Sequence, residues 1–310
     1  MWPKRLAAGS VRCADVLASR RTASRCSVVH RGRQVSPNPL GGKGMRIALF
    51  SDIHGNRFAL EAVLEDARSL GADAYWALGD LAAIGPEPVA VLERLAGLEN
   101  ATVIRGNTDR YIVTGEGPPP SLEDAHANPD LIGLFARVAA SFAWTRGYVT
   151  AAGWFDWLES LPLEARVTLP DGSRLLAVHA SPGSDDGEGI HPGRSPSELA
   201  PLIAGCGADI VCVGHTHEPL LCRVGDVCVV NLGSVSNPTA PDLRASYVMV
   251  EALASGTTVE HRRVAYDHAA FIEAVRSSRH PEAEFILNFQ RGEKVGRSPH
   301  AAPSLVGATR

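Results

Sequence analysis

The stretch that decides the fold is IALFSDIHGN, which runs from Ile47 to Asn56. Four apolar residues lead directly into Asp52 and His54, an acid and a histidine two positions apart. A buried acid and a buried imidazole are costly to desolvate unless they gain partners. The pattern therefore predicts a buried strand whose end carries polar groups that find their partners elsewhere in the chain.

The composition is that of an ordinary globular protein. The chain has 310 residues, of which 45% are hydrophobic and 21% are charged, so it can bury a sizeable core as one large domain or two. No stretch approaches 18 consecutive apolar residues, and no transmembrane helix is expected. The six cysteines form no CxxC pair. They favour free, mostly buried thiols and a reducing, cytoplasmic compartment over disulfides.

Charge is unevenly distributed along the chain. Residues 1–44 hold nine Lys or Arg and one acid, which leaves 21 basic and 33 acidic side chains in the remainder. Such an acidic body argues against binding to nucleic acid or to an anionic membrane. The basic segment 1–44 is similar in composition to an organelle transit peptide, and a translation start placed too far upstream explains it equally well. We expect disorder in 1–44 and in the polar tail, 291–310.

From Met45 the chain alternates between strand and helix patterns, and 45–290 is the expected domain. Strands are expected at 46–50, 74–78, 101–104, 175–178, 210–213, 220–224, 227–230, 245–250 and 257–264. Helices are expected at 58–69, 88–95 and 268–276, with a helical insertion at about 118–161. The alternation in the first half predicts a parallel sheet, and the run of strands in the second half predicts a second, mixed sheet.

Polar residues suited to metal binding follow five of these strands. They are Asp52 with His54, then Asp80, Asn107, His179, and His215 with His217. Ligands of open α/β sheets bind beyond the carboxyl ends of the strands, so the seven side chains are expected to converge on one sheet edge. Each motif alone has an ordinary explanation as a turn or a surface pair. Five such strand ends in one chain favour a metal site.

The ligand types indicate the kind of metal. Carboxylates, imidazoles and one amide, without a thiolate, suit two divalent transition-metal ions; Mn is favoured, and Fe, Zn, Ni or Co are alternatives. A carboxylate can bridge two ions about 3.5–4 Å apart, and the pKa of a bound water then falls towards about 7. The residues therefore predict metal-assisted hydrolysis, with a phosphate ester as the substrate class.

The ordered motifs SDIHGN, LGD, RGNTD, VHAS and GHTH resemble those of the calcineurin-like metallophosphoesterase superfamily. Within it, the chain is similar to the small bacterial and archaeal phosphodiesterase-like branch, over about residues 45–286. The resemblance implies a four-layer α/β/β/α sandwich with a helical lid insertion. It also implies a small phosphate-ester substrate and a dinuclear centre between the two sheets.

Carried over by motif, the resemblance also implies a role for each ligand. The first metal would be held by Asp52, His54 and His217, the second by Asn107, His179 and His215, and Asp80 would bridge them. A metal-bridging hydroxide would attack phosphorus in line with the leaving group. Asn107, His179, His215 and Asp80 are thus the expected catalytic residues. Asp109 would accept a hydrogen bond from a ligand histidine or cap the following helix.

One position departs from the pattern of the superfamily. Many members carry a histidine where this chain has Thr108, and a threonine hydroxyl cannot act as an acid at neutral pH. This favours diesters or activated esters and leaves open which group protonates the leaving group. Alternatives are a non-catalytic scaffold like that of the retromer coat, a nuclease, or a dinucleoside-polyphosphate hydrolase. The complete ligand set disfavours the scaffold, and the acidic body disfavours nucleic-acid binding.

Several residues around the motifs have two interpretations each. Arg146, in the helical insertion, would contact a substrate phosphate or serve structure alone. Asn231 and Ser234 would steady the site or cap a loop. Gly106 is expected to allow a close backbone approach, and Gly214 a tight loop. Oligomeric state is not indicated by any of these features.

Overall fold

The computed structural model describes residues 25–28, 44–239 and 241–291 of the chain. Segments 1–24, 29–43 and 292–310, which make up most of the two regions expected to be disordered, lie outside the described residues. Arg25–Val28, however, forms strand β1, which pairs antiparallel with β11 (Gly256–Val264). The expectation of disorder therefore does not hold for these four residues.

Within the described residues, six strands form the first sheet, in the order β1-β11-β10-β2-β3-β4. The remaining bounds are β2 (Met45–Phe50), β3 (Ala74–Leu78), β4 (Ala101–Ile104) and β10 (Ala245–Leu253). Strands β2, β3 and β4 are parallel, as the sequence predicts. The assignment of β10 and β11 to the second sheet was wrong: β10 pairs antiparallel with β2, with Val250 opposite Ile47.

The second sheet has five strands among the described residues, in the order β5-β6-β7-β9-β8. Their bounds are β5 (Glu164–Thr168), β6 (Arg174–Val178), β7 (Ile210–Val213), β8 (Leu220–Val224) and β9 (Val227–Asn231). Strands β6, β7 and β9 are parallel, and β5 and β8 pair antiparallel at the two edges. Each sheet therefore contains three neighbouring parallel strands, at one side of the first sheet and in the middle of the second, and crossover connections bring their ends together.

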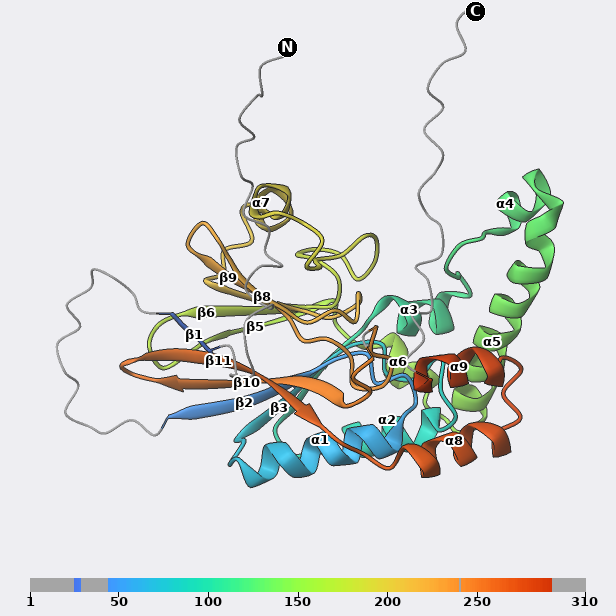
Figure 1. Ribbon diagram of the computed structural model, residues 1–310, viewed down its shortest axis with the longest axis horizontal. Helices are drawn as coiled ribbons and strands as arrows, with labels where there is room; N and C mark the ends of the chain where they lie inside the picture. The colour runs from blue at the N-terminus through green and yellow to red at the C-terminus, as the bar shows by residue number, and fades with distance from the viewer. Residues whose placement is uncertain (1–24, 29–43, 240, 292–310) are drawn as a thin grey trace, which may run out of the picture.

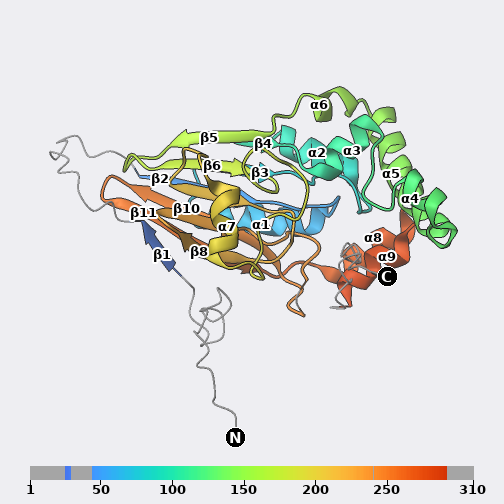
Figure 2. The same cartoon turned by 90° about the horizontal axis from the view of Figure 1, so that it is seen from above.

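The two sheets face each other, and helices cover their outer faces (Figures 1 and 2). Helices α1 (Arg57–Ser69) and α2 (Pro88–Ala96) lie against the first sheet, and α7 (Pro196–Ile203) lies against the second. The four-layer α/β/β/α sandwich is thus confirmed. Helices α8 (His268–Ser277) and α9 (Ala283–Gln290) pack together beside α1.

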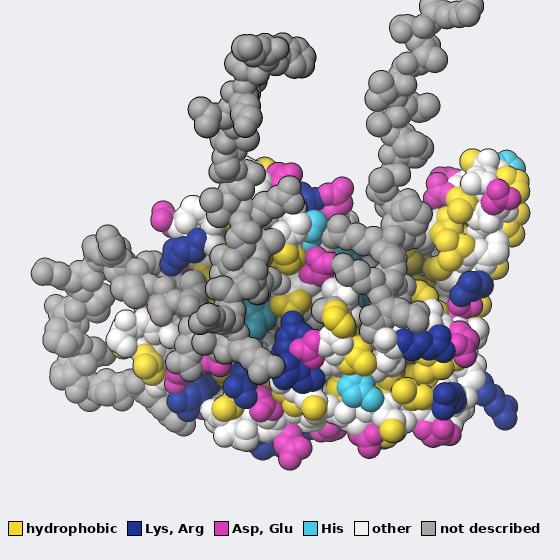
Figure 3. Space-filling model, in the orientation of Figure 1, with side chains coloured by type: hydrophobic (Ala, Val, Ile, Leu, Met, Phe, Trp, Pro, Cys, Tyr) yellow, Lys and Arg dark blue, Asp and Glu magenta, His cyan; other side chains and the backbone are white. Residues whose placement is uncertain are grey.

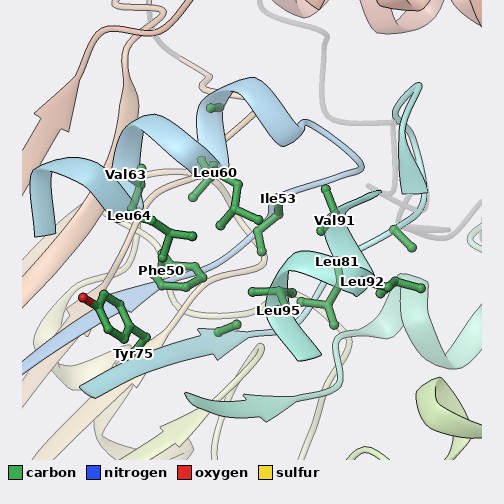
Figure 4. Packing of buried hydrophobic residues seen from close by; sticks show 14 of the residues in the cluster. Phe50, Ile53, Leu60, Val63, Leu64, Tyr75, Leu81, Val91, Leu92 and Leu95 are labelled. Carbon is green, nitrogen blue, oxygen red and sulfur yellow. The ribbon is translucent and has the colours of Figure 1, made fainter. Parts of the chain in front are cut away.

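Burial on both faces explains the apolar run of β2. Ile47 and Leu49 belong to the hydrophobic cluster between the sheets, together with Leu175 of β6. Ala48 and Phe50 face α1 instead, and Figure 4 shows the Phe50 ring packed beneath the side chains of that helix. A strand that is buried on both faces reads as a continuous hydrophobic run rather than as an alternation.

The segment expected to be helical forms an arm, which we define as residues 122–159. It contains α4 (Leu122–Ala127), the short 3₁₀ helix η2 (Pro129–Leu131), α5 (Ile132–Ala151) and α6 (Phe155–Glu159). The arm stands with α3 (Asn107–Thr114) at the end of the sandwich that β2, β3 and β4 reach (Figures 1 and 2). Its role as a lid stays a prediction. In the part of the chain that the structure describes, no helix combines the length and apolar character needed to cross a bilayer.

Candidate metal centre

The seven predicted ligands all follow strand ends, but these ends belong to both sheets. Asp52, His54, Asp80 and Asn107 follow β2, β3 and β4 of the first sheet, whereas His179, His215 and His217 follow β6 and β7 of the second. The seven side chains were expected along one edge of one sheet, but they lie along two edges that face each other, one from each sheet. The structure brings the seven side chains together in the gap between them.

Five of the seven residues hold an unusual backbone conformation. The φ angles are 57° at Asp52, 47° at His54, 53° at Asp80, 68° at His215 and 60° at His217. Residues other than glycine rarely adopt positive φ, which costs on the order of 1–3 kcal/mol each and gathers at functional sites. Each strand end thus turns sharply enough to direct its side chain into the gap.

The first group of ligands is formed by Asp52, His54 and His217. The Nε2 atoms of His54 and His217 lie 3.2 Å apart, and His217 Nε2 lies 3.1 Å from Asp52 Oδ1. Asp52 and His54 are buried, whereas the His217 side chain is 15% exposed. The three side chains therefore surround one position that opens towards solvent on the His217 side.

The second group is centred on His179. Its Nε2 lies 3.4 Å from Asp80 Oδ1 and 3.2 Å from Asn107 Oδ1. Asn107 Oδ1 lies in turn 3.1 Å from Nδ1 of His215. Asp52, Asp80 and His179 form a second set of mutually close ligand atoms, so Asp52 belongs to both groups. Asp80 also reaches both, since its Oδ2 lies 3.8 Å from His54 Nε2.

One buried oxygen tests whether these residues fit a metal. Asp52 Oδ1 is enclosed by His217, His54 and His179 at 3.1, 4.0 and 3.9 Å, yet it makes no hydrogen bond of acceptable geometry with any described residue. A buried carboxylate oxygen without a partner is strongly unfavourable. A divalent cation placed among these nitrogen and oxygen atoms would satisfy it, so the donor set fits a metal.

The electrostatics of the centre also favour a cation. Burial by itself raises the pKa of Asp80, but the neighbouring His179 and His54 hold it well below its ordinary value. Burial likewise lowers the pKa of His179, yet Asp80 and Asp52 overcome this effect and raise it to about 10. The field of the two carboxylates thus stabilises positive charge at His179 Nε2. A bound metal ion would meet the same field and displace the proton.

Backbone carbonyls orient three of the imidazoles. The Nδ1 atoms of His54, His179 and His217 lie 3.1, 2.6 and 2.7 Å from the carbonyl oxygens of residues 83, 78 and 237. A carbonyl only accepts, so each Nδ1 donates and each Nε2 is left to face the centre. His215 is reversed: its Nε2 donates to the Gly187 carbonyl at 2.8 Å, and its Nδ1 faces Asn107.

Two glycines allow the loops to approach. A Cβ on Gly106 would lie 2.2 Å from Asp80 Oδ1, and one on Gly214 would lie 2.1 Å from Ser51 Oγ. Next to Gly106, the Thr108 backbone N–H donates to Asp80 Oδ1 at 3.0 Å, while the buried Thr108 hydroxyl has no partner among the described residues. The close approach expected at Gly106 is confirmed, Gly214 shows a close approach as well where only a tight loop was expected, and Thr108 contributes its backbone to the centre.

Asp109 caps helix α3, but as the third helical residue of a capping box and not as the N-cap. Its carboxylate accepts from the N–H groups of Gly106 at 2.9 Å and Leu81 at 3.0 Å. It makes no hydrogen bond to any ligand histidine that the structure describes. Burial first, and then the neighbouring Asp80, raise its pKa to about 7. Asp109 therefore joins the loop after β3 to the start of α3.

Asn231 and Ser234 do steady the surroundings of the centre. Asn231 Nδ2 donates to the Gly214 carbonyl at 2.7 Å and to Thr216 Oγ1 at 2.9 Å, which holds the loop that carries His215 and His217. Ser234 Oγ donates to the Asp52 carbonyl at 3.0 Å. Both residues thus support the backbone of the strained ligand positions.

A network of ions and one tyrosine beside the centre was not predicted. Arg110 of α3 donates to Asp185 at 3.0 Å and to Asp186 at 2.8 Å, and the Tyr111 hydroxyl also donates to Asp186. These contacts hold the loop whose Gly187 carbonyl orients His215. The adjacent acids of SDD, Ser184 to Asp186, were the available signal, but their partners lie about 75 residues away along the chain.

The sandwich and its convergent nitrogen and oxygen ligands define a metallophosphoesterase-like α/β protein. The family model described as the calcineurin-like phosphoesterase superfamily domain matches residues 45–255. The chain belongs to this superfamily, which is one of phosphoric ester hydrolases in general and typically binds divalent metals.

Known relatives agree with this assignment. The uncharacterized protein MJ0912 of Methanocaldococcus jannaschii is 28% identical over 252 residues, which span 76% of this chain and 94% of that protein. A metallophosphoesterase from Sphaerobacter thermophilus is 27% identical, with a TM-score of 0.62 over 81% of this chain and 100% of its own. The hypothetical protein PH1004 from Pyrococcus horikoshii OT3 shares the fold, with a TM-score of 0.66 at 22% identity over 80% of this chain and 99% of its own.

Proposed function

We propose that the chain is a dinuclear metal-dependent phosphoesterase that acts on phosphodiesters. The observation that carries the proposal is the position of Asp80 between two ligand groups. Its Oδ2 lies 3.8 Å from His54 Nε2 and its Oδ1 lies 3.4 Å from His179 Nε2, so one carboxylate faces both positions. Such an arrangement suits a bridging ligand in a two-metal site.

The residues divide between two ions as follows. The first ion would be held by Asp52, His54 and His217, the second by Asn107, His179 and His215, with Asp80 shared. When bound, the ions would supply a water of lowered pKa and would offset the negative charge of the phosphoryl oxygens. We propose Mn²⁺ as the native ion, since the donor set holds carboxylates, imidazoles and an amide but no thiolate.

The protein itself would orient the substrate. Asn107 Oδ1 is directed at His179 and His215, and its amide group, which also hydrogen-bonds the Tyr111 hydroxyl, has one further hydrogen to donate to a phosphoryl oxygen as negative charge develops. The half-buried His215 and His217 mark the side from which a small ester would enter. We place this reaction in the cytoplasm, with a small soluble phosphate ester as the substrate.

The preference for diesters rests on Thr108. Its side chain is 5% exposed, has no ionisable group and donates no hydrogen bond within the described part of the chain. A substrate whose leaving group departs without protonation suits this site better than one that must expel an alkoxide. Diesters and activated esters with acidic leaving groups meet this requirement.

The test compares a chromogenic phosphodiester with the matching monoester. Metal-stripped protein would be refilled with Mn²⁺ and measured beside Asp80→Asn, with Asp226→Asn at an exposed position as the matched control. We expect metal-dependent turnover that favours the diester, and a loss of about 10²–10³-fold in Asp80→Asn alone.

The other outcomes separate the alternatives. Preferred hydrolysis of the monoester would overturn the diester proposal and keep the phosphoesterase. Turnover with one bound ion per chain would overturn the dinuclear centre. Neither turnover nor bound metal would leave the non-catalytic scaffold as the better interpretation.

A further inference from the structure

A cavity lies between α3 and the arm, outside the metal centre. Its volume is about 520 Å³, within the range of sites that hold small organic ligands. One wall is α3 with the segment that follows it, and the other is α5. The cavity is therefore a feature that the arm adds to the sandwich.

The walls are mainly apolar. Tyr111 contributes from α3, and Phe135, Val138 and Phe142 contribute from α5. Aromatic and aliphatic walls of this kind stabilise an apolar group by removing its surface from water. Figure 3 shows hydrophobic side chains gathered on the surface of the same arm.

Arg146 supplies positive charge to this apolar cavity. It has no carboxylate partner among the described residues, and its guanidinium lies 5.2 Å from the centre of the Phe155 ring. Glu116 also lines the cavity, but it is ion-paired with Arg110. A Cβ at Gly115 would come within 3.3 Å of the Arg146 guanidinium, so the glycine leaves room for that group at the wall. An anion would complete the cavity.

Tyr111 connects the cavity to the metal centre. Its ring lines the cavity, while its hydroxyl donates to Asp186 and interacts with the Asn107 side chain. Asn107 opens α3 and Tyr111 follows four residues later, about 6 Å along the helix axis. Tyr111 therefore lies between the cavity and Asn107, so an organic group on a phosphorus held at Asn107 would have to pass Tyr111 to enter the cavity.

We propose that the cavity binds the organic group of the phosphodiester that is not the leaving group. This group is an apolar ring or chain whose negative charge lies at Arg146. This inference rests on the proposed function, because it assigns the phosphorus to the metal centre. It narrows the substrate class to diesters of an anionic, largely apolar alcohol.

The experiment uses three p-nitrophenyl phosphodiesters that differ in the second ester group, which is methyl, naphthyl or carboxynaphthyl. With the Mn²⁺-loaded protein, we expect kcat/KM to rise at least tenfold from methyl to naphthyl and again to carboxynaphthyl. Arg146→Gln should remove the second rise alone. Ala139→Trp, at an exposed position that lines the cavity, should remove both rises and leave methyl-ester turnover unchanged.

Two variants serve as matched controls. Ala140→Trp places the same side chain on α5 at an exposed position outside the cavity, and Arg137→Gln removes an arginine that is paired with Glu282 instead. Both should behave as wild type. Equal rates for methyl and naphthyl diesters, or equal effects of Arg146→Gln on the naphthyl and carboxynaphthyl diesters, would overturn the subsite.

A binding measurement keeps this inference separate from the proposed function. Carboxynaphthyl methyl phosphonate would be titrated by fluorescence into wild type, Arg146→Gln and Ala139→Trp. If no diester were hydrolysed, binding weakened by both variants would still support the subsite, and binding unaffected by them would overturn it. A change of oligomeric state in Ala139→Trp alone, without an effect on binding, would assign the cavity to a second copy of the chain.

Discussion

The metal centre and the arm lie at the same end of the molecule but are built in opposite ways. The centre consists of polar side chains that are mostly buried. Five of its residues have a positive φ angle, and three of its histidines are held by hydrogen bonds to main-chain carbonyls. The arm consists of helices that leave apolar side chains exposed, such as Leu122 at 68% and Ile132 at 55%. Tight packing therefore constrains substitutions in the centre, whereas the exposed surface of the arm tolerates them more easily.

A glycine-to-alanine substitution in each region should show the largest difference in unfolding free energy. Gly214→Ala would push a Cβ against Ser51 and Asp52, so we expect a loss of about 3 kcal/mol in unfolding free energy and a loss of bound metal. Gly147→Ala, on α5 with nothing within 4 Å of its Cβ, should instead stabilise by about 0.5–1 kcal/mol. Urea unfolding and metal analysis measure both. Equal effects at the two positions would contradict the contrast.

Metal removal should destabilise the centre and spare the arm. The buried carboxylates of Asp52 and Asp80 lose their cation, and an ion present at 100 times its Kd contributes about 2.7 kcal/mol. Thermal unfolding with and without Mn²⁺ should show this shift. Amide exchange should increase at the loops after β2 and β3 and stay unchanged in α5. Faster exchange of α5 alone would reverse the prediction.

Acid should loosen the contact between the arm and the C-terminal helices. Burial lowers the pKa of His280, which lies against Ser141 and Trp144 of α5, to about 4 from an ordinary 6.5. Between these values the unfolded chain binds the proton and the native chain does not, so the unfolding free energy falls as pH falls from 6.5 towards 4. We expect this residue to account for about 1 kcal/mol of the loss.

Unfolding of His280→Asn across that pH range checks the assignment. The variant should lose less stability on acidification than wild type does. His126→Asn, at an exposed position of α4, is the control. An identical pH dependence in wild type and His280→Asn would assign the acid sensitivity elsewhere.

The smallest effect is expected at the surface of the arm. Leu122→Ser replaces a side chain that is 68% exposed, so the unfolding free energy should change by less than about 0.5 kcal/mol. Leu60→Ser, in the α1 core, should cost several times more. A large loss from Leu122→Ser would show that a partner covers the arm in solution.

The seven side chains singled out from the sequence lie together in the structure, whereas the pairing of the strands was predicted only in part. The strands at 74–78, 101–104 and 210–213 match their predicted bounds, because each is a compact apolar run that ends in a polar motif. Strand β10 was assigned to the wrong sheet, since its apolar residues would fit either one. Its partner β2 lies about 200 residues away, and no local pattern encodes that choice.

Local signals were present at α7, which was missed, and were weak at α3, which was anticipated only as the helix that Asp109 would cap. Helix α7 begins with Ser195, Pro196 and Glu198, a capping box with proline in the first turn, and this pattern could have been recognised. Helix α3 starts at a predicted ligand, and its short length hides its period. The positive φ angles of Asp52 and His54 leave no trace in composition, because aspartate and histidine occur in ordinary loops as well.

The carbonyl acceptors behind three ligand histidines have a consequence for redesign. Because the acceptors belong to residues 78, 83 and 237 of the main chain, substituting the side chains there removes none of these hydrogen bonds. The orientation of the imidazoles is thus insulated from changes in the surrounding residue types. A library that varies the cavity face of α5 would therefore leave the orientation of these three imidazoles unchanged.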